Sequence, residues 1–206
     1  VNIIDELQYD SIYHEHLRFY LLKPLDVLMK MYGFKIIDAI RIPNYGGSIR
    51  VIASLNPDIK PSQNVKKIFN LEKSKGFYSS KKYKKFSNDI VKSKKKLIKL
   101  LSNLKKKKKR IVGIGCPGRC ITLLAYCNIN NKFLDYIAEQ SSSLKLNLFT
   151  PNTHLQVLDE KYFFEDQPEY ALILSWHYGK NVMKNLRNKG YKGKFILPLP
   201  YPKILN

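Results

Sequence analysis

The sequence predicts an α/β fold in three parts: a helix with an antiparallel strand pair, a long basic amphipathic helix, and a mostly parallel α/β sheet. Three observations predict it. Apolar residues near the start recur at helical spacing, a lysine-rich segment keeps a single apolar stripe, and from Arg110 short apolar runs alternate with helical segments. With 206 residues, 44% of them hydrophobic, the chain has enough material for a buried core.

Residues 1–56 are interpreted as the end of one domain. A helix is predicted over Leu17 to Tyr32, where leucine and methionine recur at spacings of three and four and Gly33 follows as a stop. The runs "FKIIDAIRI" and "SIRVIASL" flank a "PNYGG" turn and therefore predict two antiparallel strands behind this helix.

Residues 57–109 are predicted to form a connecting basic helical segment. Between Lys60 and Arg110 lie 20 of the 37 basic residues and only two acids, so this segment carries most of the net charge of +21. Such a charge raises the question of a nucleic-acid partner. The aromatic residues are expected to be used in the core instead, and nucleic acid is not favoured. The apolar stripe consists of Tyr83, Phe86, Ile90, Leu97, Leu101 and Leu104.

Residues 110–206 are predicted to form the parallel α/β domain. Strands are expected in "RIVGIG", "FLDYIAE", "YALILSW" and "KFILPLP", with helices in "ITLLAYC" and "NVMKNLRN". No apolar run approaches the roughly 20 residues that a membrane-spanning helix needs, and no export signal is visible, so no membrane partner is expected.

The three cysteines, Cys116, Cys120 and Cys127, are odd in number and closely spaced. This spacing argues against a disulfide framework and for a reducing compartment, so a cytoplasmic location is expected. Because no fourth ligand lies nearby, the cysteines are interpreted as small buried thiols and not as a zinc site.

The first candidate site is "YHEH", where Tyr13, His14, Glu15 and His16 bring half of the chain's histidines beside a carboxylate and a phenol. Histidine is the side chain best suited to proton transfer near neutral pH, and a neighbouring carboxylate can orient its ring. Three interpretations stay open at this point: a catalytic cluster, a metal pair without an obvious third ligand, and a structural cluster at a strand end.

The second candidate is "GIGCPG", in which Gly113, Gly115 and Gly118 form G-x-G-x-x-G between a predicted strand and a predicted helix. Glu139 follows at about the distance that a dinucleotide-binding loop has. Against this interpretation, Pro117 removes one backbone amide that could face a phosphate. A tight strand-to-helix turn explains the same letters.

Three further stretches carry candidate substrate contacts. In "YGGSIR", Gly46 and Gly47 permit a close backbone approach, Ser48 adds a hydroxyl, and Arg50 could pair with a phosphate. A hairpin turn followed by a surface arginine is the alternative. His154 in "TPNTH" and His177 in "SWHY" are expected near the carboxyl edge of the sheet, although either could be an ordinary loop histidine.

The motif "YDSIYHEHLRFYLLKPLDVLMKMYGFKIIDAIRIPNYGGSIRV", followed in order by "GIGCPGRCITLLAYCNI", "TPNTHLQV" and "YALILSWH", resembles the sugar C-methyltransferases. These enzymes transfer a methyl group from S-adenosylmethionine to a carbon of a nucleotide-linked keto-sugar. The resemblance is strongest over Tyr9 to Arg50. It departs from the family at "GCPGRCIT", where the family has Gly-Ala-x-Ala-Lys-Gly-Asn-Thr and this chain keeps Gly115 and Thr122 but carries Arg119 in place of the lysine.

The resemblance implies the end of a class I methyltransferase sheet followed by a complete Rossmann-like domain. The S-adenosylmethionine loop and a zinc-binding cysteine module are expected upstream or on a separate chain, and no metal site is expected in these 206 residues. Without that donor-binding half, no methyl transfer is expected. The alternative is a non-catalytic Rossmann-like module that binds a nucleotide-linked sugar or supports assembly.

The resemblance also implies roles for individual residues. His16 carries over as the base, with Tyr13 and Glu15 beside it, because methylating carbon next to a ketone requires removal of a proton and stabilisation of the resulting oxyanion. The expected substrate contacts are His14, Gly46, Gly47, Ser48, Arg50, Gly115, Arg119, Thr122, His154 and His177.

Overall fold

The structure is a computed structural model that describes residues 1–206, with the exception of the side chain of Tyr45. The chain forms two units. The N-terminal unit contains Val1–Leu7 and His14–Asp89, and the C-terminal unit contains Gln8–Tyr13 and Ile90–Asn206. The short segment Gln8–Tyr13 therefore packs with residues far along the chain. The three-part division drawn from the sequence at residues 56 and 109 stays a prediction.

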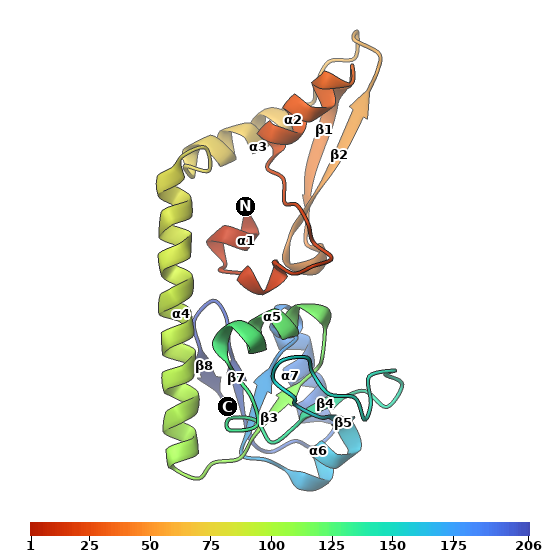
Figure 1. Ribbon diagram of the computed structural model, residues 1–206. Coiled ribbons are helices and arrows are strands. Elements are labelled where there is room, and N and C mark those ends of the chain that lie inside the picture. The colour runs from red at the N-terminus through yellow and green to blue at the C-terminus, as the bar shows by residue number, and fades with distance from the viewer. The chain divides into compact units, whose positions relative to one another are not determined.

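The N-terminal unit is built around a β-hairpin (Figure 1). Strands β1 (Lys35–Ile42) and β2 (Ser48–Ser54) pair antiparallel across the short 3-10 helix η2 (Asn44–Gly46), as predicted. Helix α2 (Leu22–Met31) and helix α3 (Gln63–Ser74) pack on one face of this hairpin, and a short helix, α1 (Asn2–Asp5), begins the chain. The core of the unit consists of Leu22, Ile36, Ala39, Val65 and Ile68.

Helix α2 begins at Leu22 and not at Leu17, so the predicted helix was five residues too long at its start. Pro24 explains the difference. Proline lacks a backbone N–H and its ring clashes with the carbonyl four residues earlier, so it is tolerated only in the first turn of a helix. Residues 17–20 consequently form no regular structure.

Glu72 of α3 holds the start of α2. Its side chain is buried, and its two carboxylate oxygens accept hydrogen bonds from the backbone N–H groups of Leu22 (2.6 Å) and Lys23 (3.3 Å). These N–H groups belong to the first turn, where they have no partner within the helix and where a negative charge is favoured. The hydroxyl of Tyr78 donates a third hydrogen bond, at 2.8 Å.

The C-terminal unit contains a six-stranded sheet. Its strands in chain order are β3 (Ile111–Ile114), β4 (Ile137–Glu139), β5 (Val157–Asp159), β6 (Tyr170–Ile173), β7 (Lys194–Leu197) and β8 (Lys203–Leu205). The spatial order is β5-β4-β3-β6-β7-β8, with β8 antiparallel to β7 and all other pairs parallel. This is the doubly wound order, which reverses between β3 and β6. The predicted α/β, Rossmann-like fold class is confirmed.

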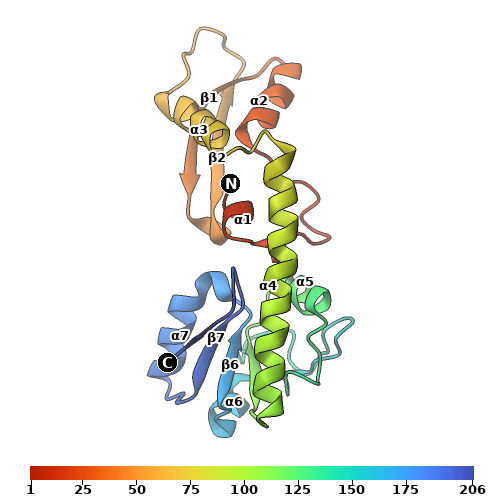
Figure 2. The same ribbon diagram turned by 90° about the vertical axis from the view of Figure 1, so that its left-hand side faces the viewer.

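Helices cover both faces of this sheet. Helices α6 (Glu160–Asp166) and α7 (Gly179–Asn188) contribute Phe163 and Leu186 to a core with Val112 and Ile114 of β3. The other face is covered by α5 (Gly118–Cys127), and Figure 2 shows α5 and α7 on opposite sides. The three-residue strands β5 and β8 were not predicted, because segments this short carry no periodicity of their own.

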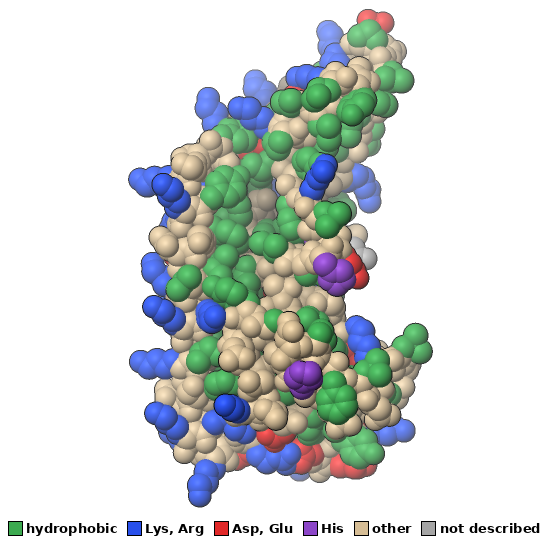
Figure 3. Space-filling model, in the orientation of Figure 1, with side chains coloured by type: hydrophobic (Ala, Val, Ile, Leu, Met, Phe, Trp, Pro, Cys, Tyr) green, Lys and Arg blue, Asp and Glu red, His purple; other side chains and the backbone are tan. Residues whose placement is uncertain are grey.

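The basic segment forms α4 (Ser80–Lys106) as a single long helix, preceded by the separate helix α3. Leu97, Leu101 and Leu104 of the predicted stripe are buried, whereas Tyr83 is exposed, so its assignment to the core was wrong. Figure 3 shows Lys and Arg side chains along the exposed side of α4. In the described part of the chain, no helix is both long and apolar enough to span a membrane.

We expect Glu72→Ala to lower the free energy of unfolding by about 2 kcal/mol, because it leaves the buried N–H of Leu22, the partly buried N–H of Lys23 and the Tyr78 hydroxyl without an acceptor. Urea unfolding followed by circular dichroism would measure the change. Asp58→Ala, in the exposed loop after β2, is the matched control and should change stability little. Equal stabilities for the two variants would contradict the role of Glu72 in starting α2.

Candidate functional site

The tetrad Tyr13 to His16 lies in a turn that directly follows the 3-10 helix η1 (Tyr9–Ser11). It does not lie at a strand end, so the strand-end position considered for a structural cluster is excluded. The side chains of His14 and Glu15 are 88% and 67% exposed, with His14 Nε2 and Glu15 Oε1 3.9 Å apart. The ring of His16 packs edge-on against Phe19, with centroids 5.8 Å apart. Both imidazoles are therefore accessible to a molecule approaching from solution.

Apolar side chains continue this exposed surface of the N-terminal unit. Leu17 is 85% exposed, and Phe19 and Tyr20 are also exposed. On the hairpin face turned away from α2 and α3, Ile40 and Ile52 are exposed as well. Scattered exposed apolar residues are normal, but a run of them beside a polar tetrad is typical of a surface that another part of a protein covers.

In contrast, residues 8–11, which precede Ile12 and the tetrad, are buried in the C-terminal unit. Segment Gln8–Tyr13 lies along α5. The Tyr9 hydroxyl and the Cys127 sulfur are 3.4 Å apart, and the Thr122 hydroxyl donates to the carbonyl of Ile12 at 3.5 Å. The ring of Tyr13 lies over Gly118, where an added Cβ would be 3.5 Å from Cε2. The tetrad thus begins on a segment that is fixed to a helix.

A buried ion pair lies at the centre of this attachment. Asp10 accepts two hydrogen bonds from Arg119, at 3.0 Å from Nε and 2.8 Å from Nη2. Its Oδ2 also accepts from the indole N–H of Trp176 at 2.8 Å, and the guanidinium carbon lies 5.6 Å from the indole ring centroid. Asp10 is 1% exposed and Arg119 8%. The two groups neutralise each other in a place where either charge alone would be costly.

Sequence reasoning placed Arg119 among the substrate contacts and missed Asp10 and Trp176. The only available signal was position: Asp10 stands three residues before Tyr13, and Trp176 directly precedes His177. Nothing in the sequence pattern pairs residues that are 109 positions apart.

The glycine loop has the predicted context, between β3 and α5, but its glycines face the protein itself. A Cβ at Gly113 would lie 2.9 Å from Leu174, and one at Gly115, whose φ is +79°, would lie 2.4 Å from the Ser175 hydroxyl. Glu139 accepts hydrogen bonds from the backbone N–H groups of Cys116 (2.6 Å) and Gln140 (3.0 Å). Both of its carboxylate oxygens are thus engaged, and the geometry supports a structural turn.

The predicted contacts in "YGGSIR" lie in the hairpin turn and at the start of β2. Gly46 and Gly47 have φ values of +85° and +110°, which favour glycine. The Ser48 hydroxyl donates to the carbonyl of Asn44 at 3.1 Å, while Arg50 is exposed on β2. The turn alone accounts for the glycines and for Ser48, and Arg50 is left accessible.

The two later histidines lie at opposite ends of the sheet. His177 lies in η3 (Trp176–Tyr178), after the carboxyl end of β6, as expected. His154 precedes β5 and therefore lies at the amino end of the parallel strands, so the expectation that it lies at the carboxyl edge was wrong. Because parallel strands share one direction, a histidine before a strand and one after a strand face different edges.

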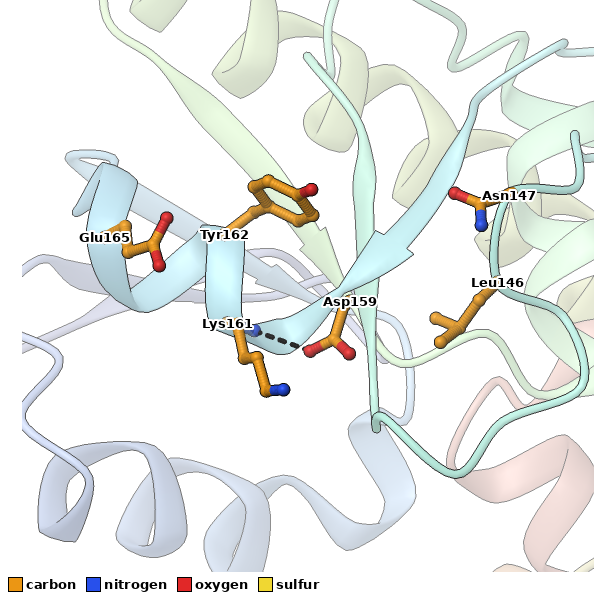
Figure 4. A pocket seen from close by; sticks show the side chains of 6 residues that line it. All are labelled: Leu146, Asn147, Asp159, Lys161, Tyr162 and Glu165. Atoms are coloured by element: carbon orange, nitrogen blue, oxygen red, sulfur yellow. Dashed lines mark hydrogen bonds between the residues drawn. The ribbon is translucent and has the colours of Figure 1, made fainter.

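An open hollow of about 540 Å³ lies at the outer edge of the sheet, next to β5 and α6 (Figure 4). Asp159 caps α6 there, accepting a hydrogen bond from the backbone N–H of Lys161 at 2.9 Å, which lowers the pKa of its carboxyl. The hollow contains none of the predicted site residues. Its lining residues are Leu146, Asn147, Asp159, Lys161, Tyr162 and Glu165.

The described residues form neither a metal-binding cluster nor an open glycine face. Among the described residues, no three His, Cys, Asp or Glu side chains are grouped closely enough to hold a metal ion. The sulfurs of Cys116 and Cys120 lie 3.9 Å apart and both thiols are buried, as is Cys127. The prediction of buried free thiols is confirmed. The loop after β3 likewise has no open face on its glycines for a methyl donor.

We expect His177 to titrate below its usual pKa of about 6.5. Burial is the main cause, the positive charge of Arg119 adds to it, and Asp10 opposes it. Near and below pH 6.5 the unfolded state therefore binds a proton at His177 more readily than the folded state does. The free energy of unfolding consequently falls as the pH falls below about 6.5. An NMR titration of the imidazole would measure the midpoint, and Arg119→Gln should raise it. A midpoint at or above 6.5 would contradict this electrostatic description.

Comparison with known proteins identifies the family. The profile of the family described as C-methyltransferase C-terminal domain matches residues 43–200. The chain is also 24% identical to C-methyltransferase NovU of Streptomyces niveus over its whole length, and it spans about half (49%) of the length of that relative. The chain belongs to the C-methyltransferase C-terminal domain family.

Proposed function

We propose that this chain supplies the substrate-binding part and the catalytic base of an S-adenosylmethionine-dependent C-methyltransferase that acts on a nucleotide-linked keto-sugar. The observation that carries the proposal is the tetrad: two accessible imidazoles, a carboxylate and a phenol lie on a turn whose preceding residues are fixed to a helix. Membership of the C-methyltransferase family supports the reaction class.

The chemistry assigns one task to each residue. His16 accepts the proton from the carbon next to the ketone, because a neutral imidazole is an effective base near neutral pH. Glu15 lies next to it in the chain and is the carboxylate that can orient the ring. The Tyr13 hydroxyl donates a hydrogen bond to the oxygen on which negative charge develops. S-adenosylmethionine, when bound, supplies the electrophilic methyl group that the resulting carbanion attacks.

A second part, upstream or on a separate chain, completes this enzyme in our proposal. Residues 1–56 then form the end of a methyltransferase sheet, and the donor site and the zinc module lie in the other part. Two observations support this. The chain spans about half of its relative, and the hairpin of the N-terminal unit is two-stranded with apolar side chains on its open face.

The remaining substrate contacts stay predictions. Of these, His14 and Arg50 are exposed and could reach an anionic or polar group, whereas Thr122 already donates to the carbonyl of Ile12. Gly46, Gly47 and Ser48 lie at the hairpin turn beside Arg50. His154 and His177 cannot contact one substrate group together, because they lie at opposite ends of the sheet.

The alternative is a non-catalytic module that binds a nucleotide-linked sugar or supports assembly. It is favoured by the complete doubly wound sheet of the C-terminal unit, which needs no further strand. The two proposals differ in turnover: the module binds the sugar nucleotide and stays inactive even after the donor-binding half is supplied.

In an enzyme completed by its donor-binding half, His16→Asn should lower kcat by roughly 100-fold to 10,000-fold and change the KM for the sugar nucleotide little, because a base acts in the transition state. Steady-state kinetics with a thymidine diphosphate keto-sugar would measure this. Asp58→Asn, on an exposed loop, serves as the control for handling and folding. If His16→Asn retains the full kcat, His16 is not the base.

For the chain alone, we expect calorimetric titration to detect binding of a thymidine diphosphate sugar and no binding of S-adenosylmethionine. The physical reason is that the loop after β3 faces the protein's own side chains. The titration should be repeated at two salt concentrations, because the many lysines attract anions non-specifically and this attraction falls with salt. Tight donor binding would show that the donor site lies in this chain, against the proposal.

A further inference from the structure

In doubly wound sheets, ligands bind in the crevice beyond the carboxyl ends of the strands, where the strand order reverses. In this protein the reversal lies between β3 and β6, so the crevice is flanked by the loop from β3 to α5 and the loop from β6 to η3. The two loops touch: a Cβ at Gly115 would lie 2.4 Å from the Ser175 hydroxyl. A ligand at this place would have to contact residues from both loops.

In this protein the segment Gln8–Tyr13 contacts residues that follow both strands. Arg119 comes from the first turn of α5 and Trp176 from the loop after β6, and both donate hydrogen bonds to the single carboxylate of Asp10. A bidentate arginine is the arrangement that proteins use for carboxylates and phosphates of ligands. Asp10 thus takes the place that the anionic group of a bound ligand has in other doubly wound domains.

The rest of the segment is fixed in the same manner. Gln8, Tyr9 and Ser11 are buried, and the Tyr9 ring packs edge-on against Tyr126 with centroids 5.4 Å apart. Burial also raises the pKa of the Tyr9 phenol, which keeps it neutral beside Cys127. The segment ends at Tyr13, which lies over Gly118 and is the first residue of the tetrad. The attachment therefore holds the chain up to Tyr13, which is the tetrad residue that belongs to the C-terminal unit.

We infer that Asp10, Arg119 and Trp176 are positioning residues that hold the segment Gln8–Tyr13, which ends on the first residue of the tetrad, in the ligand crevice of the Rossmann-like unit, and that Arg119 does not bind substrate. The inference rests on the proposed function in one respect: an effect of these residues on kcat requires that His16 acts as the base. The occupation of the crevice by Gln8–Tyr13 is independent of it and can be tested without turnover.

The first experiment measures the attachment. Asp10→Asn keeps the size of the side chain and an acceptor for Trp176 but removes the charge that pairs with Arg119. We expect hydrogen exchange at the backbone N–H groups of Ser11 and Ile12, which donate within η1 to Gln8 and Tyr9, to become at least tenfold faster. Acrylamide quenching of Trp176, the single tryptophan, should also increase.

The matched control is Asp5→Asn. Asp5 also pairs with two cations, Lys75 at 2.6 Å and Lys82 at 2.7 Å, but it belongs to the N-terminal unit. Asp5→Asn should leave the hydrogen-exchange rates of Ser11 and Ile12, and the acrylamide quenching of Trp176, within about twofold of the wild type. The double variant Asp10→Asn with Arg119→Gln replaces the ion pair by a neutral amide pair and should slow the exchange again relative to Asp10→Asn. Unchanged exchange and quenching in Asp10→Asn would overturn the inference.

The second experiment measures positioning in the completed enzyme. Asp10→Asn should lower kcat at least tenfold and leave the KM for a thymidine diphosphate keto-sugar within about threefold, with partial recovery of kcat in the double variant. If Arg119→Gln instead raises that KM while kcat stays unchanged, Arg119 is a substrate contact and the inference fails. If His16→Asn has no effect on turnover, the proposed function fails, and the exchange experiment alone still decides whether the crevice is occupied.

Discussion

The ion pair between Asp10 and Arg119 is the interaction on which the candidate site depends. A carboxylate and a guanidinium removed from water are each costly, and the cost is offset only when the two remain together with their hydrogen bonds satisfied. The bidentate geometry and the indole N–H of Trp176 meet this condition. The pair therefore tolerates little displacement, and it fixes a segment from the start of the chain onto a helix that follows 109 residues later.

This constraint gives the Rossmann-like unit an unusual role. Its sheet has the doubly wound order and a glycine loop at the expected place, yet the glycines are explained by close packing against Leu174 and Ser175. Glu139, which would hold a ribose in a dinucleotide site, accepts two backbone N–H groups instead. The fold that binds a nucleotide in many enzymes is used here to hold part of its own chain. Fold and site must therefore be argued separately.

The N-terminal unit has the opposite character. Its core is small, one carboxylate starts its main helix, and apolar side chains lie exposed on the hairpin and after the tetrad. A hairpin of two strands is only marginally stable without further packing. Together with the coverage of about half of C-methyltransferase NovU, these features support the proposal that another part of the protein completes this unit.

The sequence by itself determined the local elements and the family motif. Helical spacing predicted α4, because burial of one face imposes a period on the chain. Apolar runs around a turn predicted the hairpin, and their alternation with helical segments predicted α5, α7 and the parallel sheet. The tetrad was visible as four adjacent letters. Only the tertiary structure decided that Arg119 faces Asp10, that Tyr83 is exposed and that His154 lies at the amino end of the sheet. These facts depend on pairing between distant residues, on which local periodicity carries no information.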